Sequence, residues 1–121
     1  MPKLRGRLTI GGQILTEREL TQDKNQKNRF VARQWIPYVY PENGESVTVE
    51  ISTDTGKHLI PLKNKGKAGV LTNEVDNETS YAWGTLTKGY GETVGFTAGI
   101  MFRKRKKNVP LFSEEGNADA K

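Results

Sequence analysis

The sequence contains no cysteine, which excludes disulfide bonds, thiolate nucleophiles and cysteine-ligated metal sites. Its single histidine, His58, follows a predicted turn, where a histidine is far more often a surface residue than a general base. No segment has the continuous apolar run of a membrane helix or a signal peptide. We therefore expect a cytoplasmic protein that is not an enzyme, with no metal, no cofactor, no small-molecule substrate and no membrane partner.

Apolar residues are also few, at 34% of 121 residues, while charged residues make up 27%. A chain of this length and composition predicts one domain with one modest core. The net charge is +5, although the last eight residues carry −2. An excess of positive charge on a small domain favours a polyanionic partner.

Alternation of apolar and polar residues is the dominant pattern and predicts β-strands. Residues 4–15 alternate up to a Gly-Gly pair that predicts a bend, and residues 46–52 and 58–62 flank a hairpin turn at 53–56. Residues 79–87 and 93–103 predict another pair, the second of them a central strand. Residues 29–40 predict a strand limited by Pro37, which cannot donate a ladder hydrogen bond.

Three segments lack this pattern. Residues 16–28 are almost wholly polar and predict a mobile loop, and residues 63–69 predict a basic connection, with no structure predicted for 63–78. Residues 109–121 have the composition of a flexible, disordered acidic tail, which leaves 1–108 as a single β domain.

The predicted fold class is therefore all-β, with about five to seven antiparallel strands. We expect a small barrel of the oligonucleotide-binding (OB) type first, and a β-sandwich remains open as the alternative. Both use the same alternation of inward and outward residues, so the pattern does not separate them.

Cations occur together with aromatic rings, the combination that binds single-stranded nucleic acid without base readout. The last predicted strand runs directly into five consecutive cations, at 103–107, and Tyr90 lies between two glycines at a predicted hairpin tip. We expect single-stranded DNA or RNA as the ligand. The candidate binding residues are Arg5, Arg7, Arg33, Trp35, Tyr38, Lys63, Lys65, Lys67, Trp83, Tyr90, Arg103, Lys104, Arg105, Lys106 and Lys107.

The layout, a basic β module with an acidic C-terminal extension, is similar to that of single-stranded DNA-binding proteins. One alternative is a structural protein, such as a phage or viral particle component, that forms homo-oligomers through mobile arms. Another is a protein-binding adaptor that uses an exposed strand edge near Pro37.

Overall fold

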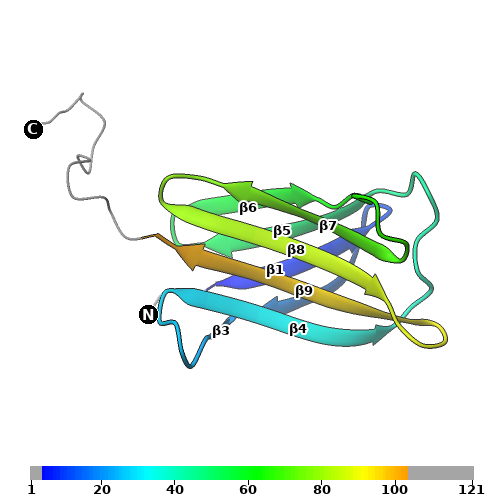
Figure 1. The fold of residues 1–121 in the computed structure, drawn as a ribbon, viewed down its shortest axis with the longest axis horizontal. Helices are drawn as coiled ribbons and strands as arrows, with labels where there is room; N and C mark the ends of the chain where they lie inside the picture. The colour runs from blue at the N-terminus through cyan, green and yellow to red at the C-terminus, as the bar shows by residue number, and fades with distance from the viewer. Residues whose placement is uncertain (1–3, 104–121) are drawn as a thin grey trace, which may run out of the picture.

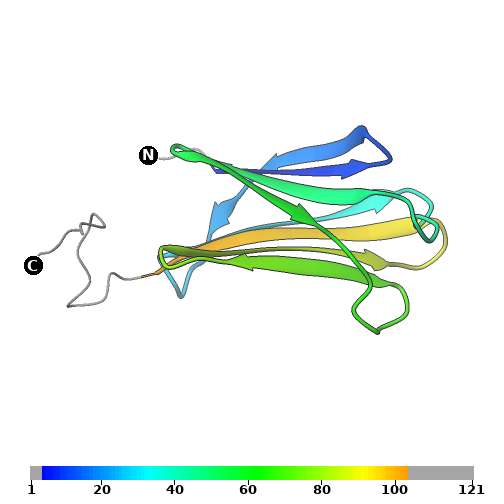
Figure 2. The ribbon, with the colours of Figure 1, turned by 90° about the horizontal axis from the view of Figure 1, so that it is seen from above.

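The computed structural model describes residues 4–103, which form nine β-strands in two antiparallel sheets. We name the four-stranded sheet, with the order β2-β1-β5-β6, sheet A and the five-stranded sheet, with the order β3-β4-β9-β8-β7, sheet B. Sheet B lies in front in Figure 1, and Figure 2 shows the two layers from above. The strands are β1 (Arg5–Ile10), β2 (Gln13–Glu19), β3 (Thr21–Gln22), β4 (Arg29–Pro37), β5 (Val47–Thr53), β6 (Gly56–Pro61), β7 (Val70–Asp76), β8 (Ser80–Lys88) and β9 (Thr93–Phe102).

The core lies between the sheets and consists of aliphatic side chains from alternate strand positions. Leu8 of β1, Val49 of β5 and Ile100 of β9 are fully buried, and Phe96 is 1% exposed. Two glycines allow the sheets to approach closely, because a Cβ on Gly84 would lie 2.7 Å from the Val49 side chain and one on Gly6 would lie 3.0 Å from Cβ of Ala98. A side chain at either position would force the layers apart.

The strongest predictions from alternation are confirmed. Strands β5 and β6 form the predicted hairpin, and β9 is the central strand of sheet B, paired with β4 on one side and β8 on the other. Strand β4 ends at Pro37, the residue that was predicted to limit it. The described residues contain no helix, and therefore none long and apolar enough to cross a membrane.

Two local predictions were wrong. Residues 4–15 do not form one bent strand, because Gly11 and Gly12 have φ values of 59° and 83° and turn β1 back into β2. Residues 16–28 are not one loop, since they contain most of β2 and all of β3. Strand β2 is an edge strand with mostly exposed side chains, so it carries little hydrophobic signal, and only Leu20, 5% exposed, anchors the crossing between the sheets.

The number of strands, nine in residues 4–103, exceeds the expected five to seven because β2 and β3 lie in the supposed loop and β7 in the unassigned segment. The two sheets do not close into a barrel, so the layered alternative describes the fold and an OB-like barrel is not confirmed. The basic connection after β6 is nonetheless tied to sheet B, because Lys63 and Thr72 exchange backbone hydrogen bonds of 3.2 and 2.9 Å.

Candidate nucleic-acid interface

The outer face of sheet B collects the aromatic and polar side chains that point away from the core. Strand pairing places Trp35 of β4 opposite Gly95 of β9, and Trp83 of β8 opposite Gly99. Midway between these pairs, Arg33 of β4 lies opposite Thr97 of β9. Because successive side chains of a strand point to opposite faces of the sheet, all of these positions lie on the solvent-facing side.

Both indoles rest on glycines of the neighbouring backbone. A Cβ on Gly99 would lie 2.1 Å from the ring of Trp83, and a Cβ on Gly95 would lie 3.0 Å from the ring of Trp35. Any larger residue at these positions would displace the rings. Glycine therefore lets each indole lie against the sheet, and Trp35 still exposes 66% of its surface.

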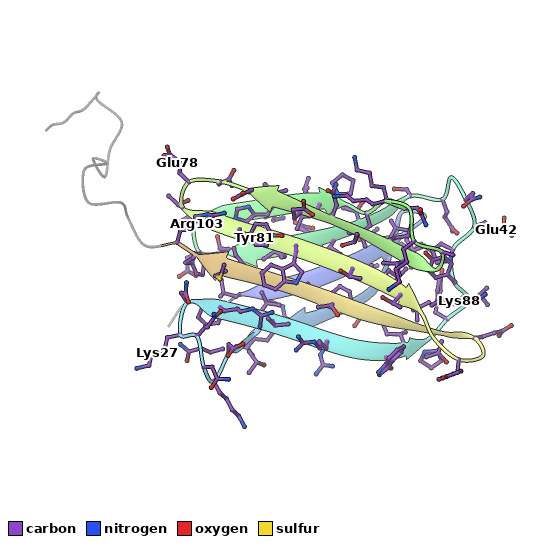
Figure 3. All side chains as sticks on the ribbon, in the orientation of Figure 1. Lys27, Glu42, Glu78, Tyr81, Lys88 and Arg103 are labelled. Carbon is purple, nitrogen blue, oxygen red and sulfur yellow. The ribbon has the colours of Figure 1, made fainter. Side chains whose placement is uncertain are left out.

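Trp83 belongs to a small cluster of stacked planar groups. The Tyr81 ring lies 5.7 Å away, tilted by 31°, and the guanidinium carbon of Arg29 lies 5.1 Å from the Trp83 ring centroid. Arg29 also forms a 2.8 Å ion pair with Asp23. A backbone hydrogen bond from Asn25, together with the Arg29 side chain, lowers the pKa of Asp23 below its ordinary value. Tyr81 is labelled on this face in Figure 3.

Arg33 lies between the two tryptophans and is exposed. It forms no ion pair with any residue of 4–103, and its carbonyl accepts a 3.2 Å hydrogen bond from the Arg18 side chain. The two arginines and Trp35 line an open depression of about 510 Å³. Gly99 lies four positions after Gly95 on β9, so the two indoles are offset by about 13 Å along the strand direction, and they lie on opposite sides of β9.

Arg5 and Arg7 lie elsewhere, on the outer face of sheet A, which is the opposite side of the molecule. Arg5 pairs with Glu17 at 2.9 Å, and Arg7 pairs with Glu17 and Glu50, each at 3.4 Å. Their charges are therefore matched by carboxylates of neighbouring strands. The hydrogen bond from Arg5, with the charge of Arg7, lowers the pKa of Glu17 below its ordinary value.

The three lysines of the basic connection lie at a third place, between β6 and β7. Lys65 pairs with Glu74 of β7 at 3.3 Å. Lys63 and Lys67 are exposed and form no ion pair within the described part of the chain. They flank the β7 edge of sheet B rather than its centre.

The remaining predicted site residues are dispersed. Tyr38 is half-buried and packs against the core, whereas Tyr90 is 97% exposed at the β8–β9 tip. Arg103 forms an ion pair with Asp76 and donates a 3.0 Å hydrogen bond to the carbonyl of Asn77. Lys104, Arg105, Lys106 and Lys107 lie outside the described residues.

The described part of the chain is nearly balanced in charge. Residues 4–103 contain 13 lysines and arginines against 11 aspartates and glutamates, so they contribute +2 of the total +5. The four consecutive cations at 104–107 contribute more than the whole described part. Among residues 4–103, no group of three or more histidine, aspartate or glutamate side chains is arranged to hold a metal ion.

The structure therefore brings together Arg33, Trp35 and Trp83 from the predicted set and adds two residues that the set lacked, Arg29 and Tyr81. The signal for both was present in the alternation, since Arg29 shares a face with Arg33, and Tyr81 shares one with Trp83. Comparison with protein-family models, with curated proteins and with solved structures gave no match.

Proposed function

We propose that this protein is a non-catalytic module that binds single-stranded DNA or RNA on the outer face of sheet B. The observation that carries the proposal is the pair of tryptophans resting on glycines of β9, with Arg33 between them. An exposed indole stacks on an unpaired base with a gain of about 1 to 3 kcal/mol, whatever the base. A closed OB-like barrel is not required, since an open sheet face supplies the same platform.

Each group on this face has a role in the proposal. Trp35 stacks on one base, and Trp83, under the guanidinium of Arg29, forms a second position where the arginine plane itself stacks on a base. Arg33 contacts a phosphate between them, because it is exposed and unpaired within residues 4–103. Bases stacked as in a duplex rise about 3.4 Å each, so platforms offset by about 13 Å along the strands, and separated further across β9, hold bases that are not adjacent.

Long-range attraction comes mainly from the run at 103–107, since residues 4–103 carry a net charge of only +2. Stacking and charge then make separable contributions to the affinity for nucleic acid. Cations that contact phosphates set the salt dependence of binding, whereas stacked rings set an affinity that salt changes little.

The test is a titration of the protein with oligo-dT, followed by tryptophan fluorescence over a series of salt concentrations. Trp35→Phe and Trp83→Phe each leave one indole, so the quenching of each platform is read separately. We expect the Trp35 signal to be quenched at low salt, with an affinity that falls as salt rises. A flat titration at low salt for both variants and for the unmodified protein would reject the proposal.

A further inference from the structure

An open groove lies at the end of the sandwich opposite to the end of β9. Figure 3 shows Glu42 and Lys88 at this end and Arg103 at the other. Two depressions of about 870 and 550 Å³ adjoin there, because Tyr40, Pro41 and Glu42 line both. We call them together the end groove.

The end groove changes in character along its length. Its first part is lined by Glu42, Glu45 and Glu92, with no cation, and none of the three forms an ion pair within residues 4–103. The shared centre is built from Tyr40 and Pro41 together with Glu42 and Glu45. The second part adds apolar Leu62 and Leu71 and the loop that carries Lys63. The groove is therefore acidic in its first part and at its centre, and Lys63 lies at its far end.

The centre of the groove also contains a hydrogen-bonding group without a partner. The Tyr40 hydroxyl is buried and has no hydrogen-bond partner within the described residues. Burial raises the pKa of this hydroxyl, so it remains a protonated donor at neutral pH. Since this oxygen is not accessible to solvent, a docked chain would pack on the rest of the Tyr40 side chain and not hydrogen-bond to its hydroxyl.

The sequence that follows Arg103 has the complementary order. Residues 104–107 are Lys-Arg-Lys-Lys, residues 109–112 are Val-Pro-Leu-Phe, and residues 114 and 115 are both glutamate. We propose that residues 104–115 of one molecule dock in the end groove of a second copy, with the cations on the glutamates, the apolar stretch on Tyr40 and Pro41, and the glutamates on the lysine loop.

The geometry favours a second copy over the same molecule. Strand β9 has ten residues and therefore spans about 33 Å, which separates Arg103 from the groove. A chain returning that distance uses about ten residues at its maximum extension. Only the residues from about 114 onward would then reach the groove, so the cations at 104–107 of the same molecule could not contact its glutamates. A neighbouring molecule placed end to end has no such constraint.

Docking of this kind joins different surfaces of the two copies, so it is heterologous and continues from copy to copy as a chain or closes as a ring. It also occupies the cations at 104–107, which the proposed nucleic-acid binding uses. Assembly and nucleic acid would therefore compete for the same run. The inference does not depend on that binding, and its test is performed without nucleic acid.

The experiment is sedimentation velocity on the full chain, freed of nucleic acid, over a roughly hundredfold range of concentration at low salt. We expect the mean mass to rise above that of the 13.5 kDa monomer with concentration and to fall back at high salt. The variant Glu42→Lys with Glu92→Lys should remain monomeric. The matched control, Glu19→Lys with Glu78→Lys, makes the same change of charge at exposed glutamates outside the groove and should assemble like the unmodified protein.

A charge swap and a peptide complete the test. Reversing Lys104, Lys106 and Lys107 to glutamate should also abolish assembly, and combining this change with the groove variant should restore it. A labelled peptide of residues 103–115 should bind the unmodified protein at least about tenfold more tightly than the groove variant. A monomer at every concentration, equal loss in the control variant, or failure of the peptide to bind would overturn the inference.

Discussion

The outer faces of the two sheets have the same alternating backbone pattern but carry different chemistry. On sheet A, Arg7 sits between Glu17 and Glu50, and Lys57 pairs with Glu50 from the far side, so the charges match one another across four strands. On sheet B, Trp35 and Trp83 rest on glycines, and Arg33 beside them has no ion pair within residues 4–103. The charges of the first face are therefore matched mainly by one another, whereas the second face exposes a ring and a cation.

The largest expected effect is the loss of stability when a side chain is added to a glycine of β9 on which an indole rests, an arrangement found on the outer face of sheet B. Gly99→Val puts a side chain where a Cβ would already lie 2.1 Å from the Trp83 ring. We expect a loss of about 1 to 3 kcal/mol in the free energy of unfolding and a shift in tryptophan emission, both measured during urea denaturation. Thr97→Val, on the same strand and face, should change stability by less than about 0.5 kcal/mol. Similar losses of stability in the two variants would show that the contact between Gly99 and the Trp83 ring does not require a glycine.

The next effect compares exposed apolar side chains on the two faces. Trp35 is 66% exposed on sheet B, and Leu59 is 62% exposed on sheet A. Trp35→Ala should weaken oligo-dT binding by about 1 to 3 kcal/mol because a stacking platform is lost. Leu59→Ala, measured by the same fluorescence anisotropy titration, should bind like the unmodified protein. If Leu59→Ala weakens binding as much, the assignment to sheet B is wrong.

Substitution of one arginine on each face should affect either the stability of the protein or its affinity for oligonucleotide, but not both. Arg7→Ala removes a partner from Glu17 and Glu50, so it should cost on the order of 1 kcal/mol of stability and leave oligonucleotide affinity unchanged. Arg33→Ala should do the reverse, with stability within about 0.5 kcal/mol and the slope of log affinity against log salt reduced by about 0.7. Urea denaturation and a salt series measure the two quantities. The distinction between the faces fails if the two variants exchange these effects.

The smallest expected effect is the change of stability at acid pH that arises from Glu17 on the outer face of sheet A. The pKa of Glu17 is lowered in the folded protein, so its contribution to stability is present above the ordinary value of 4.5 and is lost as pH falls through the lower folded pKa. Glu17→Gln should therefore show a weaker fall of the melting temperature between neutral pH and acid than the unmodified protein. Parallel melting curves in the two proteins would mean that the Arg5 and Arg7 contacts do not act on this carboxylate.

Alternation was enough to predict which residues of a strand share a face. It identified β9 as a central strand and put Arg33 and Trp35 on the same face of β4, which the structure shows to be the outer one. It could not say to which sheet a strand belongs, so Arg5 and Arg7 were grouped with rings that lie on the other side of the molecule. Their pairing with Glu17 and Glu50 depends on strand register over separations of 10 to 43 residues.

Three of the four edge strands, β2, β3 and β7, escaped prediction, and the reason is physical. Strand β2 buries almost none of its side chains, and β7 buries its own only partly, so neither shows a clear apolar face. Their polar residues resemble those of loops when read along the chain. The glycines of β9 do not show in the sequence what lies against them, and only the strand pairing and the packing identify it as the indole from each neighbouring strand.

The most direct test of the central claim is to map backbone amide chemical shifts of the isotope-labelled protein during addition of oligo-dT. We expect the largest changes on sheet B, at Arg33 and Trp35 of β4, at Trp83 of β8, and at Gly95 and Thr97 of β9. The amides of β1, β5 and β6 should change little. Changes centred on sheet A, or no changes at all, would contradict the claim that the face carrying the tryptophans binds nucleic acid.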